Sequence, residues 1–282
     1  PNVLMCDDFE DGDWYLNNCD NSGGPPYTAS DGWCGNVFGG SSPTAVCGGQ
    51  GAVGTNCAAI SRFTGGIGGD NLADHAFFNE REYNEVYIRS YFRAASGFSW
   101  GASKIFSINQ CCNTGGIYHG GVGAPFGGAN LMACPTEDCN VNSFNNPQCS
   151  GGTCPSGAYL DQNVGPEINI PGDNHWYFVE IRVKLNTVDV RNGIYELWIN
   201  DCGVNGLGCT GTPTKRASYN NVIWRGAANP AGIGTIFAGF WANPGNNGNL
   251  YWDQLKFSAV GPIGFMGSSA TAPAAPTGLS LQ

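Results

Sequence analysis

The sequence predicts an all-β protein, and three observations lead to this class. Of the 282 residues, 44 are Gly and 16 are Pro, together about 21%, whereas the average usage of the two is roughly 12%. Both residue types disfavour helix interiors. Hydrophobic residues make up 41% and charged residues 12%, so a core can form and disorder is not expected. The third observation is a period-two alternation of apolar and polar residues, which is typical of strands.

The clearest alternation covers residues 176–185. One face would carry apolar side chains and the other polar ones: Tyr177, Val179, Ile181, Val183 and Leu185 against Glu180, Arg182 and Lys184. This pattern predicts a half-buried antiparallel strand. Asn192-Gly193 precedes a second apolar run at 194–199, and an Asn-Gly pair between such runs predicts a hairpin. The same reasoning predicts further strands at 86–93, 104–108, 233–241 and 250–257.

The chain is expected to form a single domain over residues 1–266. Long Gly- and Asn-rich loops at 17–57 and 111–165 exceed what a bare scaffold needs, so they are expected to be functional, disulfide-braced or both. Residues 267–282 are small, uncharged and interrupted by Pro, which predicts an extended C-terminal tail. Within the tail, Leu279 and Leu281 have the i, i+2 spacing of one face of a strand.

Cysteine usage indicates an oxidising compartment. The thirteen cysteines lie in Gly-, Asn- and Ser-rich stretches, which favours disulfides and an extracellular location. The pairs Cys134/Cys139 and Cys149/Cys154 bracket a stretch without hydrophobic periodicity, although four thiolates could instead bind zinc. The odd count leaves one sulfur free, bonded to another chain or paired with a missing segment. No Asn-x-Ser/Thr sequon occurs, which favours a prokaryotic source.

Net charge and hydropathy exclude two classes of partner. The formal charge of −10 repels nucleic acid and anionic lipid surfaces. No apolar run approaches the roughly 20 residues of a membrane-spanning helix. The chain begins at Pro1 without an initiator Met, which is typical of a processed, mature chain. We therefore expect an extracellular protein with no nucleic-acid partner and no membrane span.

Four segments together resemble the concanavalin A-like lectin and glucanase jelly-roll superfamily, most closely its bacterial secreted polysaccharide-lyase-like and laminin-G-like domains. They are the acidic start at 8–12, the run 85–93 followed by 97–100 and Lys104, the run 176–193 with its hairpin partner, and 251–255 near the end. The resemblance covers about residues 7–258. It implies an antiparallel two-sheet jelly-roll sandwich, here with long disulfide-braced loops.

The resemblance also implies that the first and last strands pair and that nearby carboxylates hold a structural calcium ion. In this sequence the ligands would be Glu10, Asp11 and Asp253, oxygen donors of the kind that Ca²⁺ accepts. The alternative is that residues 7–13 form a solvated acidic turn. No organic cofactor is expected.

One activity within the superfamily is polysaccharide lyase chemistry on a uronic-acid glycan. Such a reaction needs a base for the proton beside the carboxylate, a cation that neutralises this carboxylate, and an acid near the leaving oxygen. Lys104 matches a lysine on a central strand of lyase-like relatives, and Arg89 and Arg93 alternate along a strand expected to neighbour it. Tyr118 and His119 would supply base and acid. The alternative is that these cations are ordinary solvent-side residues. The carboxylate spacing of the retaining glucanases is absent from the sequence, which argues against hydrolysis.

A non-catalytic glycan-binding module is a further interpretation. Sugar rings stack on aromatic side chains, and the candidates for such platforms are Trp100, Trp241 and Tyr251. The alternative is that these aromatics belong to the core.

The main hypothesis from the sequence is a secreted structural protein that assembles with itself. Its basis is the low charge, the odd cysteine and the tail, whose Leu279 and Leu281 would dock in extended form on a neighbouring subunit. A head-to-tail contact of this kind gives a ring, a filament or another homopolymer. The polysaccharide lyase and the glycan-binding module remain the alternatives.

Overall fold

The computed structural model describes the chain in segments, and all statements below refer to these. They are residues 3–7, 33–36, 44–46, 51–52, 54, 57–61, 70–98, 103–110, 121–124, 132–134, 171–190, 192–222, 232–242 and 248–266. Within them every regular element is a strand, and the strands form two antiparallel sheets. The predicted all-β class is therefore confirmed.

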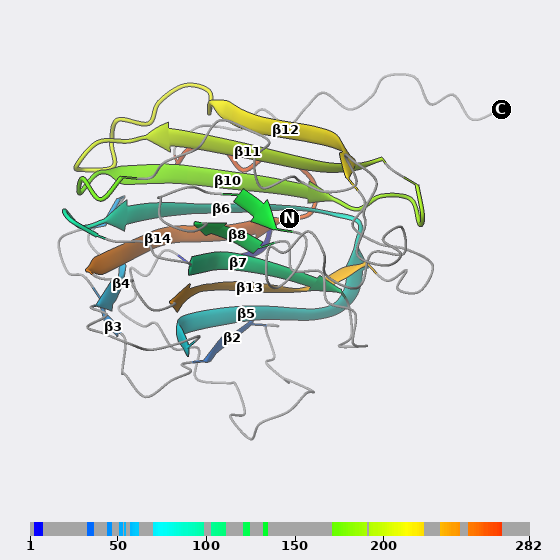
Figure 1. Cartoon of the computed structure of the whole chain (residues 1–282), viewed down its shortest axis with the longest axis horizontal. Coiled ribbons are helices and arrows are strands. Elements are labelled where there is room, and N and C mark those ends of the chain that lie inside the picture. Colours follow the sequence, from blue (N-terminus) through cyan, green and yellow to red (C-terminus); the bar gives the residue numbers. More distant parts are fainter. Residues whose placement is uncertain are drawn as a thin grey trace, which may run out of the picture.

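The larger sheet, which we call sheet A, has eight strands. Its order is β12 (Lys215–Val222), β11 (Gly193–Asp201), β10 (Trp176–Lys184), β6 (Glu85–Ala94), β14 (Asn249–Ser258), β4 (Ala58–Ser61) and β3 (Thr44–Val46), and β1 (Val3–Asp7) also pairs with β14. Figure 1 shows β12, β11, β10, β6 and β14 following one another in this order. The pairing of β1 with β14 confirms that the first and last strands are neighbours.

The smaller sheet, which we call sheet B, has six strands. Its order is β2 (Trp33–Asn36), β5 (Asp70–Tyr83), β13 (Ile233–Ala242), β7 (Ser103–Gln110), β8 (Gly121–Ala124) and β9 (Met132–Cys134). The chain passes from β5 in sheet B to β6 in sheet A through Asn84 alone, a corner visible in Figure 1. The Asn84 carbonyl accepts a hydrogen bond from Leu185 N at 2.8 Å, which ties the corner to the end of β10.

The predicted strands are present with small changes at their ends. The runs predicted at 86–93, 104–108, 233–241 and 250–257 correspond to β6, β7, β13 and β14. The long strand β5 and the polar strand β12 were not predicted. Strand β12 reads Lys-Arg-Ala-Ser-Tyr-Asn-Asn-Val, which lacks a continuous apolar face and so gives no alternation signal.

Strand β10 has the predicted alternation, but it is not half-buried. Its burial is continuous from Trp176 to Ile181, so the face expected to be polar is also covered along its first half. The hairpin with β11 is confirmed by the antiparallel register from Tyr177 opposite Asp201 to Lys184 opposite Ile194. Asn192 does not form a two-residue turn; its side chain instead accepts from Thr187 N at 2.7 Å and closes a longer connection.

The inner face of sheet A carries the apolar side chains that the alternation in the sequence predicts for one face of each strand. Val86, Ile88, Phe92 and Val179 are fully buried. The ring of Trp252 on β14 lies 5.1 Å from that of Phe92, and its indole N–H donates to the Ser90 hydroxyl. Burial of each such side chain contributes about 1.5–3 kcal/mol to stability, and the inner face of sheet A forms one buried apolar layer.

Several predicted features lie outside the described residues. These are Glu10, Asp11, Trp100, Tyr118, His119, the tail 267–282 with Leu279 and Leu281, and the cysteines Cys139, Cys149 and Cys154. For Lys104 and Trp241 the backbone is described, within β7 and β13. In the described part of the chain, none of the elements is a helix suited to crossing a membrane.

Candidate functional site

The outer face of sheet A is the face opposite to Val86, Ile88 and Phe92, and it is organised in rows across the strands. One row joins Tyr251, Arg93 and Trp176, and the next joins Asp253, Tyr91 and Phe178. A third joins Lys256, Arg89, Glu180 and Trp198, and a fourth joins Ser258, Tyr87, Arg182 and Glu196. Directly opposed residues share one face of a sheet, so each row is a continuous line of neighbours.

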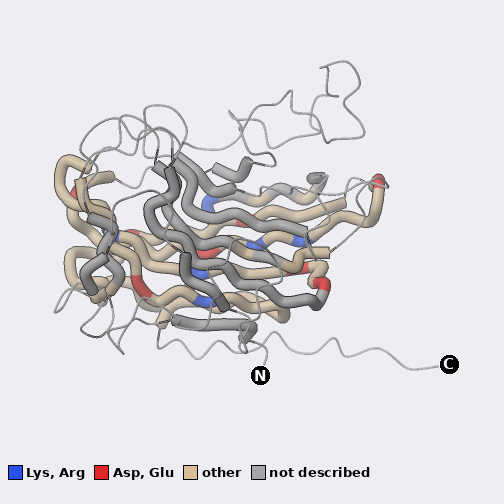
Figure 2. Tube along the Cα trace, turned by 90° about the horizontal axis from the view of Figure 1, so that it is seen from below, with Lys and Arg blue, Asp and Glu red and all other residues tan. Residues whose placement is uncertain are grey.

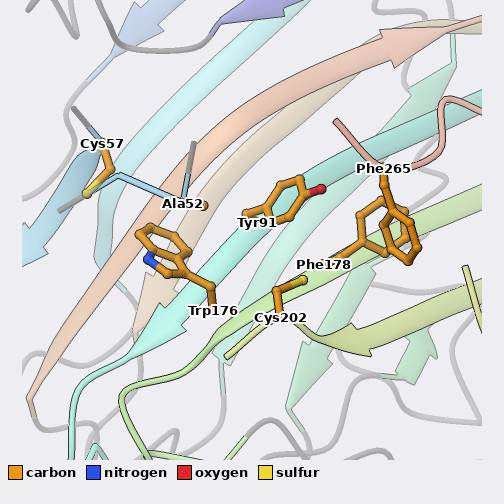
Figure 3. Packing of buried hydrophobic residues seen from close by; sticks show 7 residues of the cluster. All are labelled: Ala52, Cys57, Tyr91, Trp176, Phe178, Cys202 and Phe265. Carbon is orange, nitrogen blue, oxygen red and sulfur yellow. The ribbon is translucent and has the colours of Figure 1, made fainter. Parts of the chain in front are cut away.

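The first two rows form an aromatic layer that is covered by other parts of the chain. Tyr91, Trp176 and Phe178 are at most 1% exposed and pack with Ala52, Cys57, Cys202 and Phe265. In Figure 3 Phe265 lies against Phe178, and Ala52 lies near Trp176. The ring centroids of Phe178 and Phe265 are 4.7 Å apart in an edge-to-face arrangement, which is a favoured geometry for aromatic pairs.

The C-terminal part of this cover is the segment 259–266, which we call the strap. Glu180 holds it with both carboxylate oxygens, which accept from Ile263 N and Gly264 N at 2.8 Å each. The Tyr91 hydroxyl accepts from Met266 N at 3.2 Å. Burial raises the pKa of Glu180, against the opposing effect of these two N–H groups and Arg89. The strap therefore closes a second buried layer on the outer face.

A disulfide loop and a short upstream segment complete the cover. The Cys202–Cys209 disulfide closes the loop after β11, and Cys57 is disulfide-bonded as well. Gly206 has φ +71°, and a Cβ there would lie 2.3 Å from the Ala52 carbonyl oxygen. Only glycine fits this close approach without displacement of the backbone. The loop and residue 52 thus seal the end of the aromatic layer.

Arg89, predicted as a catalytic candidate, lies within this covered layer. Its side chain is 4% exposed, and its Nε and Nη2 donate to the Gln254 carbonyl at 3.3 and 3.2 Å. Gln254 adopts φ 55° at a register shift of β14, which turns its carbonyl toward Arg89. The expectation that Arg89 and Lys104 stand on neighbouring strands is wrong, since β6 belongs to sheet A and β7 to sheet B.

Arg93 is also buried rather than on the solvent side. Its guanidinium lies 4.2 Å from the ring centroid of Tyr251 and 5.0 Å from that of Trp176, a cation–π arrangement between two aromatic rings. Burial lowers the pKa of Arg93. One face of Tyr251, predicted as a sugar platform, is therefore occupied by Arg93.

Asp253, predicted as a calcium ligand, is fully buried in the second row. Its Oδ2 accepts from Ala52 N at 2.8 Å and so holds the upstream cover segment. Among the described residues, no group of three His, Cys, Asp or Glu side chains is arranged to hold a metal ion. The calcium site with Glu10 and Asp11 stays a prediction.

Beyond the covered layer, the outer face of sheet A carries a chain of alternating charges. Arg182 pairs with Glu85 and Glu196 at 2.7 Å each, Lys184 pairs with Glu85 at 3.6 Å, and Lys215 pairs with Glu196. Burial favours the neutral carboxyl of Glu196, but hydrogen bonds from Lys215 and Arg182 outweigh it and lower its pKa. Figure 2 shows blue and red positions interleaved along the described strands. These cations are engaged by carboxylates of the same sheet.

Lys104 lies on sheet B, at a register position opposite Trp241 of β13. Trp241 in turn lies opposite Asn71 of β5, and Lys104 lies opposite Gly123 of β8. Lys104 and Trp241 are thus cross-strand partners. The sequence analysis named them for separate reasons, the lysine for lyase chemistry and the tryptophan for sugar stacking. Sequence reasoning missed this pairing because the two positions are far apart along the chain.

These features define an all-β jelly-roll sandwich with one heavily covered sheet and a second sheet that carries the candidate lysine. Among solved structures, the chain is similar to an alginate lyase in complex with an alginate trisaccharide, with a TM-score of 0.51 and 12% identity over 93% of this chain and 99% of that one. At this identity the likeness shows the fold, which is that of a polysaccharide-lyase-like jelly roll.

Two other similar structures have lower scores. An endo-β-1,4-glucuronan lyase from the fungus Trichoderma reesei matches with a TM-score of 0.46 and 14% identity, over 90% of this chain and 94% of that one. An alginate lyase from Aplysia kurodai matches with a TM-score of 0.46 and 13% identity, over 73% and 83% of the two chains. No family model and no curated protein matches the chain.

Proposed function

We propose that this chain is an extracellular polysaccharide lyase that acts on a uronic-acid glycan through the face of sheet B that carries Lys104. The observation that carries the proposal is the contrast between the two sheets. On the outer face of sheet A, Arg89 and Arg93 are buried in the covered layer, and Arg182, Lys184 and Lys215 are paired with carboxylates. A polyanionic chain would have to displace these contacts, whereas Lys104 lies on the other sheet.

The fold likeness supports this proposal over self-assembly. The self-assembly hypothesis depends on residues 267–282, which lie outside the described part of the chain, and nothing in the described part supports it. Partners are accordingly proposed to be acidic polysaccharides. The acidic net charge of −10 does not favour polyanion binding over the surface as a whole, so recognition would have to be local.

In the proposed reaction, Lys104 neutralises the uronate carboxylate and so acidifies the neighbouring carbon–hydrogen bond. A base removes this proton, its electron pair forms the carbon–carbon double bond, and the bond to the next sugar oxygen breaks. Tyr118 and His119 stay the candidates for base and acid, with the acid giving its proton to the leaving oxygen. Arg89 donates to the Gln254 carbonyl at 3.2 Å and to the Gly264 carbonyl of the strap at 3.4 Å, and it has no part in this step.

The test is an assay of the full chain on a panel of polymannuronate, polyguluronate, polyglucuronate and polygalacturonate. New unsaturated ends absorb in the ultraviolet, and their appearance on one of these polymers is expected. Lys104→Ala should abolish the signal, and the matched control Lys184→Ala, on sheet A, should leave it unchanged. Binding without unsaturated ends would instead indicate a glycan-binding module, and no binding to any of the polymers would reject both.

A further inference from the structure

The row of register partners on sheet B runs Asn71, Trp241, Lys104 and Gly123 across β5, β13, β7 and β8. Directly opposed residues of an antiparallel pair lie on one face of the sheet, with Cβ atoms about 4.5–5.5 Å apart. This spacing is comparable with the width of one sugar ring. The register therefore places an aromatic residue and a cationic residue at directly opposed positions of two neighbouring strands.

Register shifts of sheet B gather at this row. Strand β13 shifts against β7 between Ala238 and Trp241 and against β5 between Phe240 and Trp241. Strand β7 shifts against β8 between Lys104 and Phe106. Within the described strands of this sheet, the other shifts lie between Ile233 and Thr235, beside the β5–β6 corner. Bulges redirect side chains and are over-represented next to active sites, so the backbone singles out the Lys104–Trp241 row independently of residue type.

The two ends of β13 have different surroundings. At the corner end, Ile233 and Ile236 are 2% and 0% exposed, and Gly232 N donates to Glu82 at 3.1 Å. At that end of β13, the side chains are buried and the backbone is bonded to β5. Trp241 is the second-last residue of β13, at the opposite end of the strand.

Acidic sugars need both residue types that this row supplies. The carbon–hydrogen faces of a sugar ring stack on aromatic rings, and a carboxylate is bound most strongly by a charged donor. A neutral sugar would use the aromatic position alone. A row of one tryptophan and one lysine therefore suits a uronate unit better than a neutral one.

We propose that Trp241 is a specificity-determining residue that stacks on the uronate unit whose carboxylate Lys104 binds. This inference rests on the proposed function, and it adds the residue that selects and positions the sugar ring. Trp241 takes no proton and bonds to no reacting atom, so its effect falls on substrate binding rather than on the chemical step.

The experiment measures KM and kcat for Trp241→Leu, Trp241→Phe and the control Trp198→Phe, on the polyuronate that the wild-type chain cleaves best. Trp198 lies on sheet A beside Lys215 and serves as a tryptophan remote from the row. We expect Trp241→Leu to raise KM by about threefold to tenfold, the value of one aromatic contact, with kcat changed less than twofold. Trp241→Phe should recover most of the affinity, and Trp198→Phe should match the wild type.

If Trp241→Leu folds poorly, a second measurement tests the role of Trp241. Equilibrium binding of oligouronates to Lys104→Ala, with and without Trp241→Thr, a strand-forming residue that has no aromatic ring, reports the contribution of the aromatic ring without turnover. An unchanged KM in Trp241→Leu, or equal binding by the two Lys104→Ala variants, would overturn the role of Trp241 while leaving the lyase proposal intact. A wild-type chain inert toward every polyuronate would overturn both.

Discussion

The outer face of sheet A has two ends that the same strands build in opposite ways. At one end Tyr91, Trp176 and Phe178 lie under the strap and the disulfide loop. At the other end Arg182 stands in a line of charges, with its side chain 21% exposed. Both ends use β6 and β10, so strand pairing does not create the difference. What differs is whether another part of the chain covers the face.

The comparison also explains the polar residues of each end. Under the cover, Glu180 and Asp253 satisfy backbone N–H groups of the covering segments, and a buried N–H without a partner would be costly. At the open end the charged residues satisfy one another in the presence of solvent. The carboxylates under the cover therefore hold the covering segments in place. The ion-paired carboxylates at the other end contribute little to the free energy of unfolding.

The largest expected effect comes from removing the main anchor of the strap. Phe265→Ala deletes a ring that is 3% exposed and packs on Phe178, so it should lower the free energy of unfolding by about 3–4 kcal/mol. Urea denaturation followed by tryptophan fluorescence measures this. Met266→Ala, an exposed neighbour, is the control and should change little. A loss below about 1 kcal/mol for Phe265→Ala would mean that the strap is not part of the core.

Glu180→Gln should have the second-largest effect. One amide oxygen cannot replace two carboxylate oxygens on Ile263 N and Gly264 N, and the loss is expected to be about 2 kcal/mol at neutral pH. Hydrogen exchange of residues 263–266 should speed up. Unchanged exchange there would show that Glu180 does not hold the strap.

The pH dependence of stability, compared between the wild type and Glu180→Gln, provides a further test of Glu180. The pKa of Glu180 is raised in the folded state, so the folded state binds this proton more tightly than the unfolded one. Wild-type stability should then gain as the pH falls through the folded pKa toward that of the unfolded chain. Glu180→Gln should lack this gain. Parallel stability curves for the two proteins would contradict the direction of the shift.

A smaller effect is expected at the open end. Arg182→Ala removes two ion pairs of a partly exposed network, and its cost should be about 1 kcal/mol and decrease with added salt. The comparison of unfolding midpoints at low and high salt measures it. If Arg182→Ala lowered the free energy of unfolding as much as Phe265→Ala does, and independently of salt, the two ends of the outer face would not differ in the way described.

The smallest effect concerns His175, at the edge of the covered end. Its Nδ1 lies 3.0 Å from Asp201, whose hydrogen bond raises the pKa of His175. The contact of protonated His175 with Asp201 therefore stabilises the fold below the pKa that His175 has in the unfolded chain. This stabilisation is lost as the pH rises through the pKa of His175 in the folded state. NMR titration of the ring should give a pKa above 6.5, and Asp201→Asn should return it toward that value. An unshifted titration in the wild type would disprove the contact.

Local patterns predicted much of the fold because strand alternation is a local property. The runs that became β6, β7, β10, β11, β13 and β14 were all visible in the sequence. The hidden strands were those without an apolar stripe, such as β12, or those in Gly-rich surroundings, such as β8. The site was less predictable. Lys104 and Trp241 were named separately, and only the register joined them.

The sequence by itself determined the all-β class, the main strands and the alternation that builds the inner core, because each depends on residues a few positions apart. The tertiary structure alone decided which polar residues are buried. Arg89, Arg93 and Glu180 have the spacing of a solvent face, yet segments distant in sequence cover them and supply their partners. Burial depends on what packs above a strand, and no local pattern contains that information.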